Sequence, residues 1–256
     1  MAAEQLQMLG IVWAVGGAAV VAFLLATGRL TRKVGYLFLL ISILLGFLIF
    51  SPMAPLQFQE VMSAVGKGVY TPLLFLAVML AIFVIIALVA GRVFCGYLCP
   101  IGATQEAAHL APVPKQKTAK EQRLFTYFRW GFVAVLIAAA ILLSVSLLQF
   151  FGVRQFFTLQ VASIFFFVFI GILVVALFVY RPFCRLFCPI GAILALASSR
   201  ARMKIRRTKE CINCGKCDMV CPTGEAGKTA TKAECYLCGR CLEVCPREGA
   251  LRYGKV

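Results

Sequence analysis

All twelve cysteines of this chain fall within spaced motifs. Near the C-terminus, eight of them form two consecutive C-x2-C-x2-C-x3-C-P runs, which is the bacterial ligand pattern for 4Fe–4S clusters. In two-cluster proteins the fourth cysteine of each run binds the other cluster. We therefore predict that cluster one is held by Cys211, Cys214, Cys217 and Cys245, and cluster two by Cys235, Cys238, Cys241 and Cys221.

Two other interpretations of these eight cysteines are weaker. Zinc sites use paired C-x2–4-C elements rather than a third cysteine at the same spacing and a fourth before proline. A disulfide framework is disfavoured in the cytoplasm, where the charge pattern below predicts this segment to lie. Small residues, Ala226 and Gly249-Ala250, follow each Cys-Pro step and would let the backbone approach a cluster.

The other four cysteines form a repeated pair, in which F-C-x3-C-P-I-G-A contains Cys95 and Cys99 and recurs 89 residues later with Cys184 and Cys188. Residues four apart share one face of a helix, so each pair presents two thiols together. We predict that the repeat brings all four thiols to one shared site. Such a site suits an iron–sulfur centre, a single iron, copper(I) or zinc. Buried structural cysteines and a dithiol that cycles through a disulfide stay open as alternatives.

The elements that carry these motifs are strongly apolar. The 256-residue chain is 62% hydrophobic and 14% charged, with a mean hydropathy of +0.92, whereas globular domains are about 25% charged. Spans of about 20 apolar residues cross a bilayer as helices. We predict an all-α membrane bundle of five transmembrane helices with an internal repeat (residues 1–201) plus a small α+β two-cluster ferredoxin domain (202–256). The predicted spans are 6–27, 34–50, 70–90, 131–148 and 160–180.

Basic residues predict the orientation of the bundle. Of 26 lysines and arginines, 24 lie in the three segments that five spans place on one side, and only Lys67 and Arg154 lie on the other. The positive-inside rule then puts the N-terminus outside and the ferredoxin domain in the cytoplasm of a prokaryotic inner membrane. The net charge of +16 is thus a topology signal, and nucleic acid is not an expected partner. Anionic lipid is a weaker expectation for Arg200, Arg202, Lys204, Arg206 and Arg207.

The single histidine excludes a bis-histidine haem, which needs facing pairs of histidines. We expect His109 to be an ordinary solvated residue, with proton transfer as the alternative. The chain has no glycine-rich nucleotide motif and no hydrolytic constellation. It is therefore expected to carry electrons without bond chemistry of its own.

In both F-C-x3-C-P-I-G-A motifs and the double ferredoxin run, over about residues 34–250, the chain resembles the NapH/NosR-type membrane polyferredoxins. The resemblance implies electron exchange between the quinone pool and a partner oxidoreductase, as one subunit of a quinol dehydrogenase complex. It also implies that the eight C-terminal cysteines bind clusters. A periplasmic flavin-binding domain and a C-terminal immunoglobulin-like domain are absent from the sequence, which makes NapH-like members the nearest match.

Two alternatives belong to other functional classes. One is a metal-handling protein whose Cys95, Cys99, Cys184 and Cys188 bind or reduce copper, and the other is a redox-inert anchor for a soluble partner.

A quinone site needs polar groups in an apolar cleft. By residue type, Glu60 and Arg154 are candidates, together with Gln57 and Gln59. The sequence does not predict the direction of electron flow, the quinone type or the partner enzyme.

Overall fold

The computed structural model describes residues 2–50, 54–114 and 122–255. Helices dominate the described chain, and the strands are confined to one small sheet. The elements are α1 (Ala2–Ala26), α2 (Arg32–Ile49), α3 (Ala54–Gly66), α4 (Thr71–Ala90), the π-helical turn η1 (Phe94–Leu98), α5 (Pro100–His109), α6 (Gln122–Leu142), the 3-10 turn η2 (Leu147–Phe151), α7 (Val153–Phe157), α8 (Ile164–Phe178), α9 (Pro182–Leu186), α10 (Pro189–Ser199), β1 (Met203–Arg207), α11 (Lys216–Val220), α12 (Arg240–Glu243) and β2 (Leu251–Lys255).

The membrane bundle differs from the expected five full spans. Within the described residues four helices, α1, α2, α4 and α6, are long and apolar enough to cross a bilayer. The predicted fifth span at 160–180 is α8, which has 15 residues and is about 22 Å long, shorter than the roughly 30 Å of the hydrocarbon core. The helix is short because Ser163 precedes its first turn and the backbone is extended at Val179.

The predicted span at 131–148 is wrong in its boundaries. Helix α6 runs from Gln122 to Leu142 and so contains Arg129, a charge that the sequence analysis placed outside the span. The guanidinium is tolerated because its Nη1 lies 2.6 Å from Oε1 of Glu234, and both side chains are 3% exposed. A partner that is distant in sequence thus allows a buried arginine within this helix.

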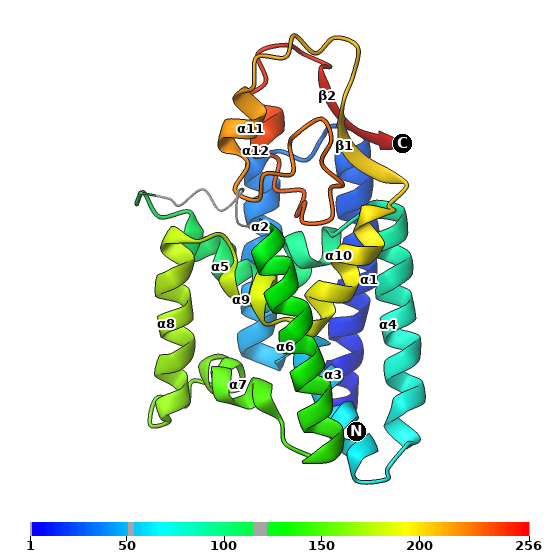
Figure 1. Cartoon of the computed structure of the whole chain (residues 1–256), viewed down its shortest axis with the longest axis vertical. Coiled ribbons are helices and arrows are strands. Elements are labelled where there is room, and N and C mark those ends of the chain that lie inside the picture. The colour runs from blue at the N-terminus through cyan, green and yellow to red at the C-terminus, as the bar shows by residue number, and fades with distance from the viewer. Residues whose placement is uncertain (1, 51–53, 115–121, 256) are drawn as a thin grey trace.

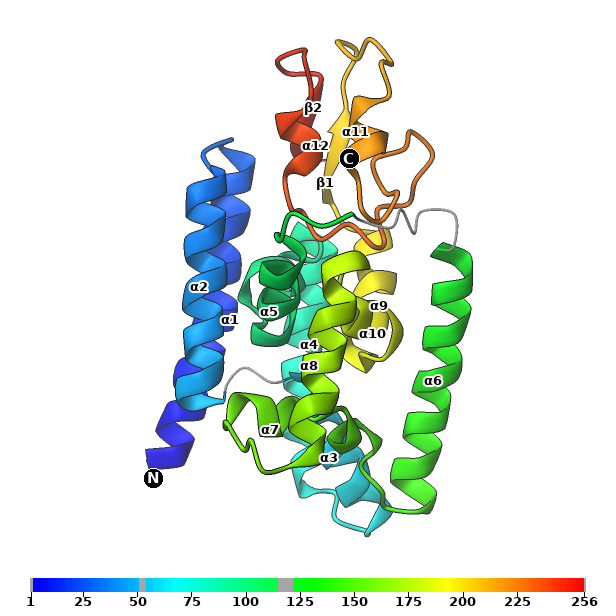
Figure 2. The same cartoon turned by 90° about the vertical axis from the view of Figure 1, so that its left-hand side faces the viewer.

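The two connections expected as outer loops are partly helical. Helix α3 lies between α2 and α4 and packs against α6, and η2 and α7 lie between α6 and α8. These elements close the end of the bundle that lies away from the C-terminal strands (Figures 1 and 2). The internal repeat therefore extends through these connections as well as through the long helices.

The cysteine motifs lie inside the bundle. Helices α5 and α10, which begin at the proline of each motif, occupy its centre and are surrounded by the long helices (Figure 2). Helix α5 packs against α8, and α10 packs against α4, so each motif helix contacts the opposite half of the repeat. Leu194 and Ala195 of α10 are 1% and 3% exposed, so this helix is buried within the bundle. Small residues allow this close packing between helices.

The C-terminal module rests on the end of the bundle that is opposite the N-terminus (Figure 1). Strands β1 and β2 pair antiparallel, from Met203 with Lys255 to Arg207 with Leu251, and hold the two ends of the module together. On the inner face of this sheet, Tyr253 donates a hydrogen bond of 2.8 Å from its hydroxyl to the carbonyl of Ala90, the last residue of α4. The sheet is thereby fixed to the bundle.

The first cysteine motif contacts the module directly. The hydroxyl of Tyr97 donates to the carbonyl of Leu237 at 2.9 Å. Beside it, Gly96 lies so close to the carbonyl oxygen of Tyr236 that any Cβ at this position would collide with it. Glycine is therefore required here to let the two backbones approach.

We predict that Gly96→Ala destabilises the docking of the module by about 1–3 kcal/mol, the usual effect of an overpacked contact. The measurements are the midpoint of thermal unfolding and the rate of proteolysis within residues 202–210, where the chain passes from the bundle into the module. Gly171→Ala in α8 is the matched control, since a Cβ there meets no atom within 4 Å. Equal stability of the two variants would contradict the prediction.

Candidate functional site: three cavities lined by cysteines

The twelve cysteines line three cavities, four in each. The cavity farthest from the bundle is lined by the predicted ligands of cluster one, namely Cys211, Cys214, Cys217 and Cys245, together with Pro246 and Ala250. Arg207 lies beside it and donates from Nη2 to the sulfur of Cys217 at 3.2 Å. A cationic donor of this kind stabilises a thiolate.

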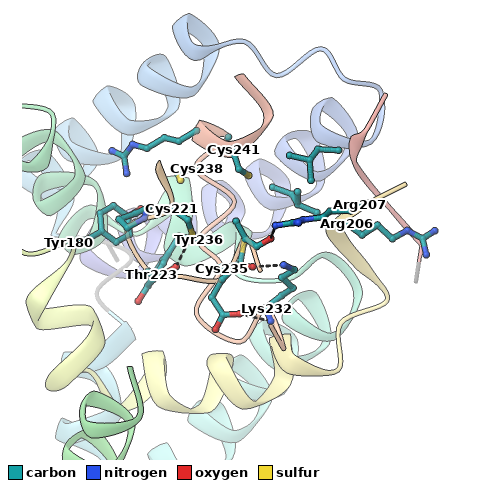
Figure 3. A pocket seen from close by; sticks show the side chains of 17 residues that line it. Tyr180, Arg206, Arg207, Cys221, Thr223, Lys232, Cys235, Tyr236, Cys238 and Cys241 are labelled. Carbon is teal, nitrogen blue, oxygen red and sulfur yellow. Dashed lines mark hydrogen bonds between the residues drawn. The ribbon is translucent and has the colours of Figure 1, made fainter. Parts of the chain in front are cut away.

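The second cavity is lined by the predicted ligands of cluster two, Cys221, Cys235, Cys238 and Cys241. Figure 3 shows these four side chains around one space, with Tyr180 and Tyr236 on one side of it. Burial raises the pKa of the Cys235 thiol to about 12, because a thiolate there loses its hydration. Iron binding compensates such a buried thiolate, which fits this donor set to a metal cluster.

The third cavity lies inside the bundle and is lined by the other four cysteines, Cys95, Cys99, Cys184 and Cys188. Each of these is between 6% and 8% exposed. The structure thus brings together the two pairs that are 89 residues apart. Within the described residues no three His, Cys, Asp or Glu side chains are close enough to share a single metal ion. Four thiols around one space suit an iron–sulfur cluster, as in the other two cavities.

The two halves build this third cavity in the same way. A Cβ at Gly102 would lie 2.8 Å from the carbonyl oxygen of Cys95, and a Cβ at Gly191 would lie 2.7 Å from that of Cys184. The glycine of each P-I-G-A segment therefore lets its helix start fold tightly over its own cysteine. In the second half, the sulfur of Cys188 also accepts a hydrogen bond of 3.2 Å from the amide of Gly191.

Gln105 connects the two halves at this cavity. Its amide nitrogen donates to the sulfur of Cys184 at 3.3 Å, and its amide oxygen accepts from the backbone amide of Phe183 at 3.0 Å. The side chain comes from α5 in the first half and holds the cysteine of the second. Hydrogen bonds to a ligand sulfur are one means by which proteins adjust cluster potentials.

Two arginines cross between the halves, and sequence reasoning missed both. Arg92 and Arg181 each lie three residues before the first cysteine of their own motif. Arg181 donates from Nη1 to the carbonyl of Cys95 and from Nη2 to that of Gly96 at 2.8 Å. Arg92 lies against the second motif, where its Nη2 is 3.3 Å from the position of a Cβ on Gly191. The repeat already contained this signal, because an arginine occurs at the same position in both halves.

Each crossing arginine is neutralised by a buried carboxylate. Arg92 and Arg129 bind the two oxygens of Glu234 at 2.7 and 2.6 Å, while Arg181 and Arg240 bind those of Glu106 at 2.9 and 2.6 Å. Although burial alone raises the pKa of Glu234, the two arginines hold it below the ordinary glutamate value. These carboxylates were also missed, since their partners are distant in sequence.

One of these charged groups has an unused donor beside the third cavity. Arg92 lines that cavity, its side chain is fully buried, and its Nη2 has no hydrogen-bond partner within the described chain. An unpaired buried donor is costly, and cluster-bound thiolates would supply the acceptor. The residues present therefore fit a cluster at this position.

Tyr236 separates the third cavity from the second. Its ring is stacked against Arg92, with the guanidinium carbon 4.1 Å from the ring centre, and against Arg181 at 4.8 Å. It lies next in sequence to Cys235 and lines the second cavity. The cavities therefore follow one another from the interior of the bundle to the outer end of the module.

Other predicted residues lie elsewhere. Glu60 and Arg154, the quinone candidates, face each other at 3.8 Å but are 61% and 62% exposed, at the end of the bundle opposite the module. Gln59 is buried and accepts a hydrogen bond from the amide of Leu148 at 2.6 Å.

His109 was expected to be solvated, and this prediction is wrong. The side chain is 3% exposed, and its Nδ1 lies 2.9 Å from the carbonyl oxygen of Ala176. Helix α5 turns this residue inward.

The basic residues considered for lipid contact have mixed environments. Arg200, Arg202 and Arg206 are exposed. Lys204 donates to the carbonyl of Ser199 at 2.6 Å, and Arg207 is paired with Asp218 at 2.8 Å. Lys115, Lys117 and Lys120, which contributed to the predicted orientation, lie outside the described residues.

The comparisons with known proteins agree with this cysteine chemistry. A family described as a 4Fe–4S binding domain matches residues 71–118 and 161–208. Each matched segment contains one C-x3-C-P pair, so the match falls on the four cysteines of the third cavity. The double ferredoxin run lies beyond both segments.

Several curated proteins are similar to the chain. The putative electron transport protein YccM of Escherichia coli is 28% identical over 57% of this chain and 45% of its own length. The methylamine utilization ferredoxin-type protein MauN of Paracoccus denitrificans is 28% identical over 61% of this chain and 56% of its own. The protein NirI of the same organism is 31% identical over 52% of this chain and 21% of its own.

The chain spans about half the length of the curated relatives that it matches. No solved structure matches it. With two matched 4Fe–4S binding segments, twelve cysteines around three cavities and a bundle of apolar helices, the chain contains a 4Fe–4S binding domain and is similar to ferredoxin-type electron transport proteins of the NapH/NosR-like kind.

Proposed function

We propose that this iron–sulfur electron-transfer protein carries electrons between the membrane quinone pool and a partner oxidoreductase, through three 4Fe–4S clusters rather than two. One observation carries the proposal: the three four-cysteine cavities succeed one another from the apolar interior of the bundle to the outer end of the module. Such an order suits transfer between a lipid-soluble carrier and a protein outside the membrane.

The residues of the chain have separable tasks in this proposal. Cys95, Cys99, Cys184 and Cys188 would hold the inner cluster, and the two sets in the module would hold the others, each supplying one-electron exchange when bound. Gln105 and Arg92 orient and neutralise the inner thiolates. The apolar walls of the cavities keep water away from the sulfurs.

The outer end of the module is where we expect the partner. There Cys214 is exposed, and Ile212 and Met219 are 59% and 60% exposed. Exposed apolar side chains beside an accessible ligand are typical of a surface where electrons leave a protein for another. The orientation in a prokaryotic inner membrane, with residues 202–256 on the cytoplasmic side, belongs to the same proposal and rests on the positive-inside rule.

Copper handling is less well supported than a resident cluster. A site that takes up and releases a metal ion needs access for that ion. The four cysteines of the third cavity are each at most 8% exposed, among helices that pack closely around them. The family match on these segments, described as 4Fe–4S binding, supports the resident cluster as well.

The number of clusters is testable by metal analysis. Anaerobically purified protein should contain about twelve iron atoms per chain, and a Cys99→Ser/Cys188→Ser variant about eight, since one of three 4Fe–4S clusters is lost. Cys214→Ser/Cys217→Ser is the matched control, in which the loss should come from the module and the inner site should keep its iron.

Eight iron atoms in the wild type, unchanged by Cys99→Ser/Cys188→Ser, would overturn the third cluster. Stoichiometric copper in the wild type would favour the metal-handling alternative instead. Both measurements need only iron, copper and acid-labile sulfide determinations on the purified chain.

The quinone part of the proposal is tested by mixing. Protein that is reduced with dithionite and then freed of the reductant should be reoxidised by decylubiquinone or menadione within seconds. The return of cluster absorbance measures this reoxidation. Reoxidation by ferricyanide is the control for intact clusters. If ferricyanide reoxidises the protein and neither quinone does, the proposed electron exchange with the quinone pool is wrong.

A further inference from the structure

A cavity of about 380 Å³ lies between the bundle and the module, beside cluster two. Its volume is within the range of about 300–1,000 Å³ that small-molecule sites occupy. One side is formed by the ends of α1 and α2 with the turn between them, including Leu25, Leu30 and Leu39. The opposite side is formed by the first motif, α5 and α12. The α1–α2 side contributes these apolar side chains together with Thr31, Arg32 and Tyr36, and the opposite side carries most of the other polar groups.

The polar wall carries Tyr97, Glu106, Arg181 and Arg240, and Cys238. Cys238 also lines the four-cysteine cavity of cluster two, so the two cavities share this residue. A molecule in the larger cavity would lie next to a predicted cluster ligand. None of the sequence candidates for a quinone site lines this cavity.

The lining carries three arginines and two glutamates, and each arginine contacts a carboxylate. Arg32 is paired with Glu243, and Arg181 and Arg240 are both paired with Glu106. The polar wall thus offers donors and acceptors, and the α1–α2 side offers apolar side chains, which suits a ligand with polar oxygens and an apolar body.

The hydrogen-bonding groups of the wall are not all used. The carboxylate of Glu106 accepts from Tyr180, Arg181 and Arg240, which leaves about one of its roughly four acceptor positions. This remaining acceptor position of Glu106 matches the hydroxyl of a quinol.

The cavity also has a route to the membrane boundary. Tyr36 and Leu110, which line it, are 43% and 41% exposed, and Arg32 and Glu243 are partly exposed beside them. The long helices α1 and α2 end at this level (Figure 2). A ligand with an isoprenoid tail can keep that tail in the lipid while its ring enters the cavity.

We propose that this cavity, between α2, α5 and α12, is the binding site for the ring of a membrane quinone. The inference rests on the proposed function and names the place where the quinone meets the protein. It replaces the candidate pair Glu60 and Arg154, which lies at the end of the bundle far from the module and whose side chains are both solvent-exposed. Binding at the cavity puts the ring beside cluster two.

The test is direct photolabelling of the purified holoprotein with an azidoquinone, followed by peptide mapping. Label should appear in the segments 25–39 and 238–243, and excess decylubiquinone should suppress it. In parallel, Leu30→Trp should weaken decylubiquinone binding at least about tenfold, because the larger side chain fills the apolar wall. Leu110→Trp is a second filling variant at a partly exposed position, in case Leu30→Trp does not fold.

Leu196→Trp is the matched control. Leu196 lines a separate cavity, between α6, α10 and the module, that contains no cysteine, and the same substitution there should leave quinone binding unchanged. Iron content and dithionite reduction of each variant verify that the clusters are intact.

The outcomes separate the two proposals. Label on residues 54–66 or 147–157, or undiminished binding by both filling variants, overturns the cavity while leaving the proposed function standing. A third outcome is that the azidoquinone labels the cavity of the wild-type protein, but no quinone reoxidises its clusters. That outcome supports the binding site and overturns the quinone-linked function.

Discussion

The structure depends on the neutralisation of buried arginines. A guanidinium within an apolar bundle is stable only when a carboxylate pairs with it, since removing one partner of a buried pair costs several kcal/mol. Arg92 and Arg181 meet this condition through Glu234 and Glu106. Glu234 comes from the module, and Glu106 of α5 also binds Arg240 of the module, so these contacts fix the bundle and the module relative to each other.

This arrangement also orders the cysteines. Because each arginine reaches from its own half to the opposite motif, the two C-x3-C-P pairs are drawn to one cavity. Tyr236 stacks on both arginines and lies next to Cys235. The same contacts that neutralise charge therefore place the second cysteine set directly above the inner one.

The grouping of the cysteines could be predicted from the sequence because ligand spacing is a local property and the exchange of the fourth ligand between clusters is a general rule. The structure gathers the cysteines in those same sets, while what each set binds stays a prediction. The start of α6 was wrong because Arg129 is neutralised by Glu234, 105 residues away. His109 was misjudged for a similar reason: its burial depends on how α5 packs against α8, which a single sequence does not encode locally. The paired outer residues Glu60 and Arg154 were identified by type, but type alone carries no information on access or cavity shape.

The position of Arg129 inside α6 has a consequence for biogenesis. When the chain leaves the ribosome, the bundle precedes the module, and Glu234 is made more than 100 residues after Arg129. Until the module folds, Arg129 lacks Glu234 as its carboxylate partner. The burial of Arg129 in α6 is therefore coupled to the folding of the module. If that folding needs iron, the supply of clusters controls when the bundle reaches its final form.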